Sequence, residues 1–162
     1  MVPTSEKEPA VNTDAIKETL FKHCLDYMNA HIETNRNAFE QAQEASLSET
    51  KTVASEEPET GKERSQREME AIGQRLEEII EQREMLQSLE YRKKFTCVES
   101  GALVATTVGT FFIAMSADEI EIDGVEYCPI SLTSPIGMAL RNKTAGESAL
   151  FREKKIKIEN IW

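Results

Sequence analysis

Apolar residues in the first third of the chain recur at alternating intervals of four and three. The stretch from Asp14 to Leu47 contains no glycine or proline, and the residues that keep this spacing are Phe21, Leu25, Met28, Ile32, Asn35, Phe39, Ala42 and Ser46. The pattern is typical of the a and d positions of a coiled coil, with Asn35 as a polar member that fixes the register. The sequence therefore predicts a long amphipathic helix, about 50 Å in length.

A second seam of the same kind follows after a polar interval. Its members are Met69, Ile72, Leu76, Ile79, Arg83 and Leu86, and Ser48 to Gln66 contains almost no large apolar residue. Two amphipathic helices joined by a polar segment predict an antiparallel coiled-coil hairpin in a monomer. Such seams also pair between chains, so an intermolecular coiled coil is the alternative. Thr60 and Glu63 fit a capping box, which predicts that the second helix starts there.

The pattern changes after Lys94 to short β-rich runs. These runs are FTCV, ALVATT, TFFIAMS, EIEI, VEYCPI and, at the end, KIKIENIW. Asp123-Gly124 is a hairpin signal, and Ser134 followed by Pro135 marks the start of one short helix. We interpret the order as β-β-β-β-α-β-β, a small antiparallel sheet with a single short helix.

The fold class expected from these patterns is α+β. The domains expected are a disordered lead-in over residues 1–13, a hairpin over 14–92 and a globular domain over 93–162. The hairpin has an acidic tip near 48–62, where the sequence ASEEPETGK places Glu56, Glu57 and Glu59 around a proline. This cluster is either a solvated loop or a functional tip.

Composition and charge limit the kinds of partner that the protein is expected to bind. The chain of 162 residues is 40% hydrophobic and 30% charged, with a formal net charge of -10. This charge argues against binding nucleic acid through its phosphates and against an anionic membrane surface. It favours a partner with a basic groove, or a metal ion. No apolar run approaches the roughly 18 residues of a membrane span, and the first residues do not resemble a signal peptide, so we expect a cytoplasmic protein.

Neither the cysteines nor the histidines indicate an enzyme. Cys24, Cys97 and Cys128 are odd in number and widely spaced, which is typical of reduced thiols and not of a disulfide framework or a zinc site. His23 and His31 lack the pattern of a metal-binding HExxH helix. Because both histidines lie in the predicted hairpin, they are not expected to reach the later cysteines and form a Cys–His catalytic pair.

The last 29 residues carry a family resemblance. Ser134, Pro135, Ala139, Leu140, Lys143, Gly146 and Glu147 match a Ser-Pro helix followed by a Lys-x-x-Gly-acid turn, and Asn142 stands where glycine is frequent. This segment resembles the end of the Gre-type bacterial transcript-cleavage factors. The resemblance implies an FKBP-like globular domain, and the order of hairpin then globular domain agrees with it.

The resemblance also implies a function. Gre-type factors insert their hairpin into the secondary channel of RNA polymerase, where two tip acids three residues apart help to hold the second catalytic Mg²⁺. The matching positions are Glu56 and Glu59, with Glu57 assisting, so the chain is expected to stimulate cleavage of backtracked RNA. It would be an accessory factor and not an enzyme, with no permanent cofactor and with Mg²⁺ shared with the polymerase. Docking is expected near Ser134, Pro135, Lys143 and Gly146.

Two alternatives stay open. The family has aspartate where this chain has Glu56, and the extra methylene lengthens that arm. The tip is then suited to occluding the channel, which predicts an inhibitor or modulator of RNA polymerase without cleavage activity. The other alternative is a coiled-coil adaptor with no relation to the polymerase.

Overall fold

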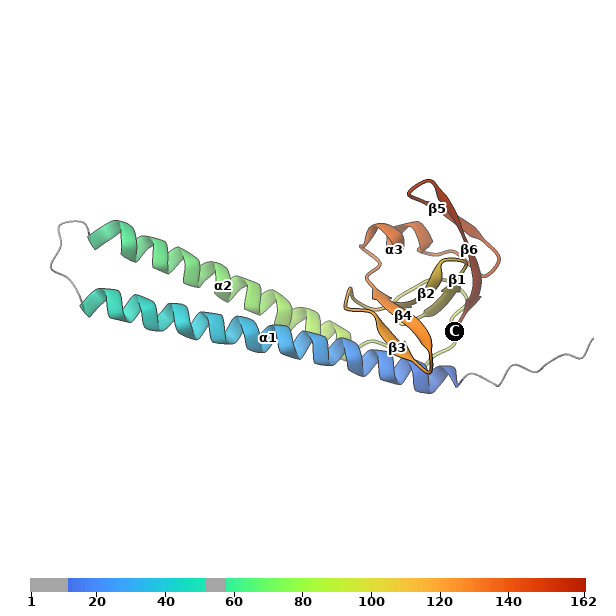
Figure 1. Cartoon of the computed structure of the whole chain (residues 1–162), viewed down its shortest axis with the longest axis horizontal. Helices are drawn as coiled ribbons and strands as arrows, with labels where there is room; N and C mark the ends of the chain where they lie inside the picture. Colours follow the sequence, from blue (N-terminus) through green and yellow to red (C-terminus); the bar gives the residue numbers. More distant parts are fainter. Residues whose placement is uncertain (1–11, 52–57) are drawn as a thin grey trace, which may run out of the picture. The chain divides into compact units, whose positions relative to one another are not determined.

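The computed structural model describes residues 12–51 and 58–162, which form two long helices, a six-stranded sheet and one short helix (Figure 1). The helices are α1 (Thr13–Lys51), α2 (Pro58–Gln87) and α3 (Pro135–Leu140). The strands are β1 (Leu103–Thr106), β2 (Gly109–Ile113), β3 (Ile120–Ile122), β4 (Val125–Ile130), β5 (Ser148–Phe151) and β6 (Lys154–Ile161). The α+β class expected from the sequence is confirmed.

The described residues fall into two compact units. The hairpin unit is Leu25–Ser88, and the globular unit combines Leu89–Trp162 with the described residues up to Cys24. The first turns of α1 therefore belong to the globular unit, and the rest of the helix belongs to the hairpin. Among the described residues, no helix is both long enough and apolar enough to cross a membrane.

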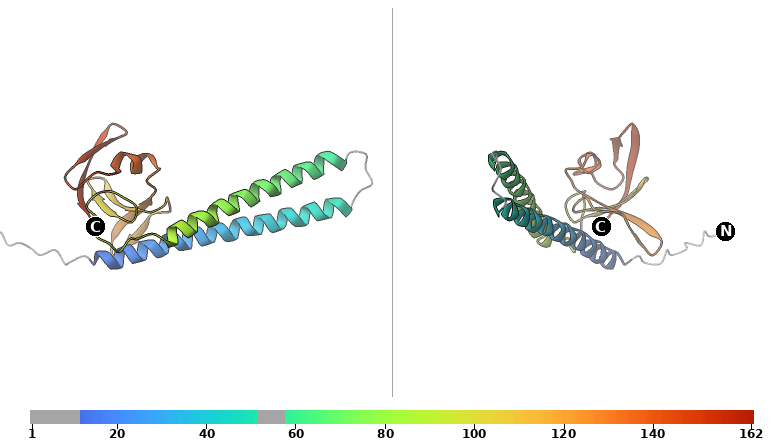
Figure 2. Two further views of the ribbon diagram at one scale, coloured as in Figure 1. Left: turned by 180° about the vertical axis from the view of Figure 1, so that it is seen from behind. Right: turned by 60° about the vertical axis from the view of Figure 1, so that its left-hand side comes forward.

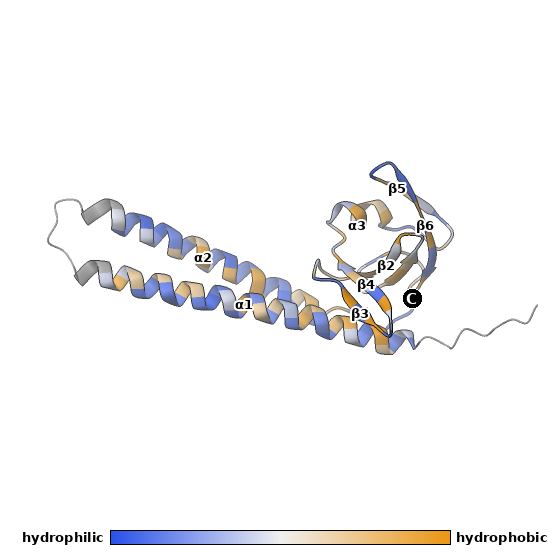
Figure 3. Ribbon diagram, in the orientation of Figure 1, coloured by the Kyte–Doolittle hydropathy of each residue, from blue (hydrophilic) through white to orange (hydrophobic). Residues whose placement is uncertain are grey.

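Within the hairpin unit, the residues of both predicted seams are all buried or half-buried. Met28 and Ile32 of α1 and Leu86 of α2 are buried, while the other seam residues of the hairpin unit are half-buried. Figure 3 shows the same arrangement as apolar positions that alternate with polar ones along both helices. The side chains that avoid water are thus those whose spacing follows the helical repeat.

Two contacts fix the register of the hairpin. The Arg83 guanidinium donates to Oδ1 of Asn29 at 3.4 Å, and a Cβ built on Gly73 would lie 3.6 Å from Cε2 of Phe39. Ten residues forward along α1 thus correspond to ten residues back along α2, and the views in Figures 1 and 2 show the two helices side by side. The helices are therefore antiparallel, and the same register holds at both contacts. The midpoint of the residue numbers in each pair is position 56, which is Glu56.

The second helix starts earlier than the capping box predicts. It begins at Pro58, so Thr60 is already helical and does not cap it. Proline is favoured at the first helical position because its fixed φ suits the helix and its missing N–H would have no partner there. With Thr60 as the N-cap, Gly61 would be the first helical residue, so the helix begins three residues earlier than the capping box predicts.

The six strands form one sheet in the order β3-β4-β2-β1-β6-β5. The sheet is mostly antiparallel, as the sequence predicts, and the one exception is the parallel pair of β2 and β4. After β2 the chain skips the neighbouring place in the sheet and forms β3 at the edge. It then returns as β4, which fills the place between β2 and β3. A two-residue turn joins β3 to β4, with φ of 52° at Asp123 and 79° at Gly124, as the predicted hairpin signal requires.

The order β-β-β-β-α-β-β expected from the sequence is confirmed, and the first strand after the helix is β5, which lies outside the apolar runs named above. One of those runs is not a strand, because FTCV forms only an isolated bridge between Cys97 and Thr144. Phe95 and Val98 of that run are nevertheless buried in the core. Their apolar character therefore reflects burial in a loop and not strand pairing.

The sheet buries side chains on both faces. Phe111 and Ile113 belong to the main core cluster, while Phe112 between them is fully buried outside that cluster, in register with buried Leu103. Because successive residues of a strand point to opposite faces, both sides of β2 are covered. On α1, the buried residues Ile16, Leu20 and Cys24 recur every four positions and lie within the same compact unit as the sheet.

Candidate functional site

The acidic cluster predicted from the sequence falls between the two long helices in chain order. Glu56 and Glu57 lie outside the described residues, between the end of α1 at Lys51 and the start of α2 at Pro58. Glu59 occupies the first turn of α2. The register places the centre of the hairpin on Glu56, which is the first of the two predicted tip acids.

Ser134 and Pro135 start α3 as the sequence predicts. The Ser134 hydroxyl accepts a hydrogen bond from the amide of Gly137 at 3.1 Å and donates to the carbonyl of Ser131 at 2.6 Å. Pro135 follows at the first helical position and is exposed. Ser134 therefore has a clear role in the fold, and its part in binding a partner stays a prediction.

The turn after α3 explains the residue types of the motif. Asn142 has a φ of 61° and Gly146 a φ of 90°, which is the left-handed region that glycine and asparagine tolerate best. Asn142 therefore occupies a backbone conformation that glycine would also adopt without strain. The Glu147 carboxylate accepts hydrogen bonds from the amide and hydroxyl of Thr144, at 2.6 and 3.0 Å, and these bonds hold its pKa below the usual value.

Lys143 and Gly146 also connect this turn to the rest of the globular unit. The carbonyl of Lys143 accepts from the amide of Val98 at 2.8 Å, and the amide of Gly146 donates to Ile158 at 2.8 Å. The Lys143 side chain is half-buried. All four predicted docking residues, Ser134, Pro135, Lys143 and Gly146, belong to the globular unit, and their part in docking stays a prediction.

The cysteines and histidines take structural positions. All three cysteines are free thiols, and burial raises the pKa of Cys24 to about 12. His23 belongs to the globular unit and not to the hairpin, because its Nε2 lies 2.8 Å from the carbonyl oxygen of Asp118. Within the residues that the structure describes, no group of three His, Cys, Asp or Glu side chains is arranged to hold a metal ion.

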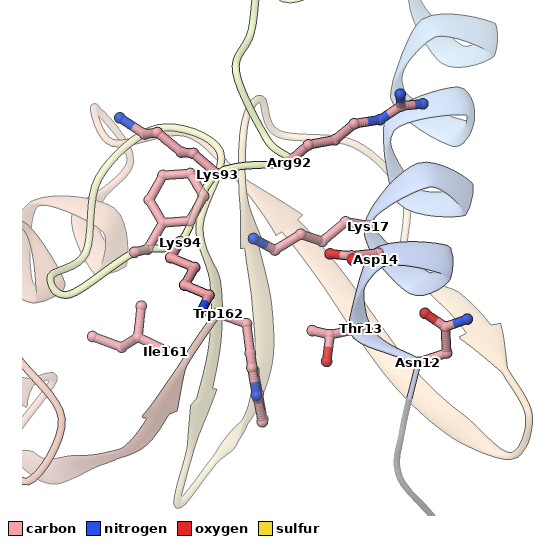
Figure 4. A pocket seen from close by; sticks show the side chains of 10 residues that line it. Asn12, Thr13, Asp14, Lys17, Arg92, Lys93, Lys94, Ile161 and Trp162 are labelled. Atoms are coloured by element: carbon pink, nitrogen blue, oxygen red, sulfur yellow. The ribbon is translucent and has the colours of Figure 1, made fainter.

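A cavity of about 500 Å³ in the globular unit was not foreseen from the sequence (Figure 4). It lies at the start of α1, and its lining residues are Asn12, Thr13, Asp14, Lys17, Arg92, Lys93, Lys94, Phe95, Ile161 and Trp162. The three consecutive cations after Tyr91 were the one available sequence signal. Their meeting with Lys17 depends on chain segments more than 70 residues apart, which no local pattern reveals.

Of the comparisons with known proteins, only the comparison with solved structures finds a similarity. No family model matches the sequence, and no curated protein matches it. Among solved structures, the chain is similar to the crystal structure of GreA factor homolog 1 (Gfh1) of Thermus thermophilus, with 16% identity, a TM-score of 0.37 and coverage of 85% of this chain and 94% of that one. A second structure, of the transcription factor Gfh1, has 17% identity, a TM-score of 0.33 and coverage of 86% and 94%.

Proposed function

We propose that this protein is an accessory factor of RNA polymerase that inserts its hairpin into the secondary channel of the enzyme. The observation that carries the proposal is the register of the hairpin, whose facing residues are centred on Glu56 within the acidic cluster. The Ser134–Glu147 motif, which resembles that of Gre-type factors, supports it. The hairpin would deliver Glu56 and Glu59, with Glu57 assisting, to the polymerase active site.

In this proposal the chain supplies ligands and has no catalytic site of its own. Carboxylate oxygens are hard donors, so the residue types of the tip suit Mg²⁺. The second Mg²⁺ of the polymerase would stabilise the leaving oxygen during hydrolysis of the RNA backbone. The part of this chain is to raise the occupancy of that ion and to orient a water molecule. The factor would thereby rescue polymerases that have backtracked.

The test is a cleavage assay on backtracked transcription complexes. We expect the wild-type protein to accelerate RNA cleavage and the Glu56→Ala/Glu59→Ala variant to lose this acceleration. The matched control is Glu63→Ala/Glu68→Ala, which removes the same charge from exposed positions further along α2. Wild-type protein that cleaves no faster than polymerase alone would contradict the cleavage function.

A second candidate function shares the same target. Glu56 is longer by one methylene than the aspartate of Gre-type factors, which favours a tip that occupies the channel without supporting cleavage. An inhibitor of this kind would slow nucleotide addition in the same assay while leaving backtracked RNA intact. If the protein neither affects the polymerase nor competes with another channel-binding factor, the adaptor alternative is correct.

The pairing of α1 with α2 within one chain supports a monomer. The a/d surface of each helix is used by its partner in the hairpin, so little of it is left for a second copy. A mass measurement in solution at increasing concentration tests this point. A stable dimer would restore the intermolecular coiled coil considered from the sequence.

A further inference from the structure

A buried lysine is the unusual feature of the cavity at the start of α1. Lys17 is only 2% exposed. Its ammonium group donates to the carbonyl of Tyr91 at 3.0 Å and lies 4.3 Å from the centre of the Phe95 ring. Within the part of the chain that the structure describes, no carboxylate forms an ion pair with it. A buried cation without a paired anion is costly, so an anionic ligand would stabilise this site.

Two of the four cations point into the cavity. Figure 4 shows the side chains of Lys17 and Lys94 directed towards its interior, whereas Arg92 and Lys93 point away from it. The outward pair has partners already, because Arg92 lies 3.8 Å from Glu18 and Lys93 lies 2.9 Å from Glu99. Lys94 has no ion pair with any described residue. Lys94 is therefore the exposed ammonium group available to a ligand, and Lys17 adds a buried charge that no described carboxylate pairs with.

The remaining lining residues indicate what else the ligand carries. Trp162 presents an indole ring on one side of the cavity, and Asp14 and Thr13 lie opposite it on α1 (Figure 4). An indole face suits the stacking of a planar base. The Asp14 carboxylate would repel a bare anion but accepts hydrogen bonds from hydroxyl groups. A planar ring, hydroxyl groups and two adjacent negative charges are together the chemistry of a nucleoside diphosphate.

We propose that this cavity is a binding site for a nucleoside diphosphate. Lys17 and Lys94 hold its phosphates, Trp162 stacks on its base, and Asp14 accepts hydrogen bonds from its ribose. The volume of about 500 Å³ lies within the range of about 300–1,000 Å³ that is usual for small-molecule sites. The partial positive charge at the start of α1 adds to the attraction for phosphate. This site does not depend on the function proposed for the hairpin.

The chain provides its own reporter, because Trp162 is the single tryptophan of the sequence. We would titrate the full-length protein with ADP and with GDP and follow indole fluorescence, with free N-acetyltryptophanamide as the blank for nucleotide absorbance. The expected result is a saturable change that weakens as salt is raised, because the contacts to phosphate are ionic. A change no larger than that of the blank would overturn the proposal.

Variants separate the site from general attraction to a charged protein. Lys94→Ala is expected to weaken ADP binding about tenfold or more, since it removes a charge-assisted hydrogen bond. Lys155→Ala, which removes the same charge from an exposed position on β6, is expected to leave binding unchanged. Equal affinity of Lys94→Ala and wild type would contradict the site. Lys17→Met is expected to abolish binding, with circular dichroism to confirm that it folds; if it does not fold, Lys94→Ala decides.

The base and the phosphates are tested separately with simpler probes. Ribose 5-phosphate and inorganic phosphate are expected to bind at least tenfold more weakly than ADP, because each lacks the base that stacks on Trp162. Inorganic phosphate that binds as tightly as ADP would show a phosphate site and would overturn the assignment to a nucleoside diphosphate.

Discussion

Lys17 shows how one residue can connect the stability of the fold to pH. Burial lowers its pKa from 10.5 to about 8, although the nearby charge of Asp14 acts in the opposite direction. The folded protein therefore releases this proton at a lower pH than the unfolded chain does. Below pH 8 the group is charged in both states, and its contribution to stability does not change with pH.

The first prediction concerns this pH range. Between pH 8 and 10.5 the contribution of Lys17 to the free energy of unfolding should rise, because the unfolded chain still binds the proton that the folded protein has released. Relative to Lys17→Met, which cannot titrate, the wild type should gain about 3 kcal/mol over this range. Urea unfolding at several pH values measures the difference. A difference that stays constant would show that Lys17 is not desolvated in the folded state.

A second prediction at the residue scale compares two glycines. A Cβ at Gly137 would overlap the carbonyl oxygen of Ser131, whereas a Cβ at Gly61 would meet no described atom within 4 Å. Gly137→Ala should therefore destabilise the globular unit by about 3 kcal/mol. Gly61→Ala should stabilise α2 by about 0.5–1 kcal/mol. Trp162 fluorescence follows the first variant, and far-ultraviolet circular dichroism follows the second. A Gly137→Ala protein as stable as wild type would contradict the close packing of α3 on Ser131.

Residue-level features were predictable from the sequence where their cause is local. The Asp123-Gly124 turn and the Ser134 cap depend on neighbours within three positions, and both were foreseen. Lys17 was not, because its hydrogen-bond partner Tyr91 is 74 positions away. A lysine in a helix is expected to be solvated until the fold brings a loop across it.

At the scale of the elements, Arg83 is a polar residue on the seam of the hairpin whose burial lowers stability. It occupies a seam position of α2, and its Nε is buried without a hydrogen-bond partner among the described residues. Replacing it with leucine should remove that cost and fill the seam with an apolar side chain. We expect Arg83→Leu to stabilise the hairpin by about 1 kcal/mol.

The measurement is the helical signal during urea unfolding. Arg75→Leu is the matched control, because Arg75 is exposed on the same helix and its replacement buries nothing. A gain in Arg75→Leu equal to that of Arg83→Leu would assign the effect to helix propensity. A loss of stability in Arg83→Leu would show that its contact with Asn29 outweighs the unpaired nitrogen.

Elements were predictable where hydrophobic spacing defines them. The two seams identified α1 and α2, and the apolar runs identified most strands. The order of elements included the strand β5, but its residues were not identified, because it is four residues long and leaves Leu150 72% exposed. The parallel pairing of β2 with β4 was missed, since it follows from the path of the chain and not from either strand.

At the scale of the whole molecule, the proposed function depends on the length of one side chain at the tip. Glu56→Asp shortens that arm to the length found in Gre-type factors. If geometry limits cleavage, this variant should stimulate cleavage of backtracked RNA about tenfold or more above the wild type, because displacement of a ligand by about 1 Å is costly in rate.

The control for this prediction is Glu57→Asp, which makes the same change beside the predicted pair. Cleavage rates on identical backtracked complexes give the comparison. If Glu56→Asp equals the wild type while both bind the polymerase, arm length does not decide between cleavage and inhibition. The tip acids Glu56 and Glu57 were predicted from the sequence and lie outside the described residues, so this part of the candidate site stays a prediction.

The symmetric register of the hairpin also limits how its length can evolve. An insertion in one helix would shift Asn29 from Arg83 and Phe39 from Gly73, so it would be selected against. Only matched insertions preserve the pairing, and seven residues in each helix would keep both seams in phase. Each such step would move the acidic turn by about 10 Å. The length of the hairpin can therefore change only in steps of one heptad per helix. A relative whose target lies deeper or shallower is expected to differ by whole heptads.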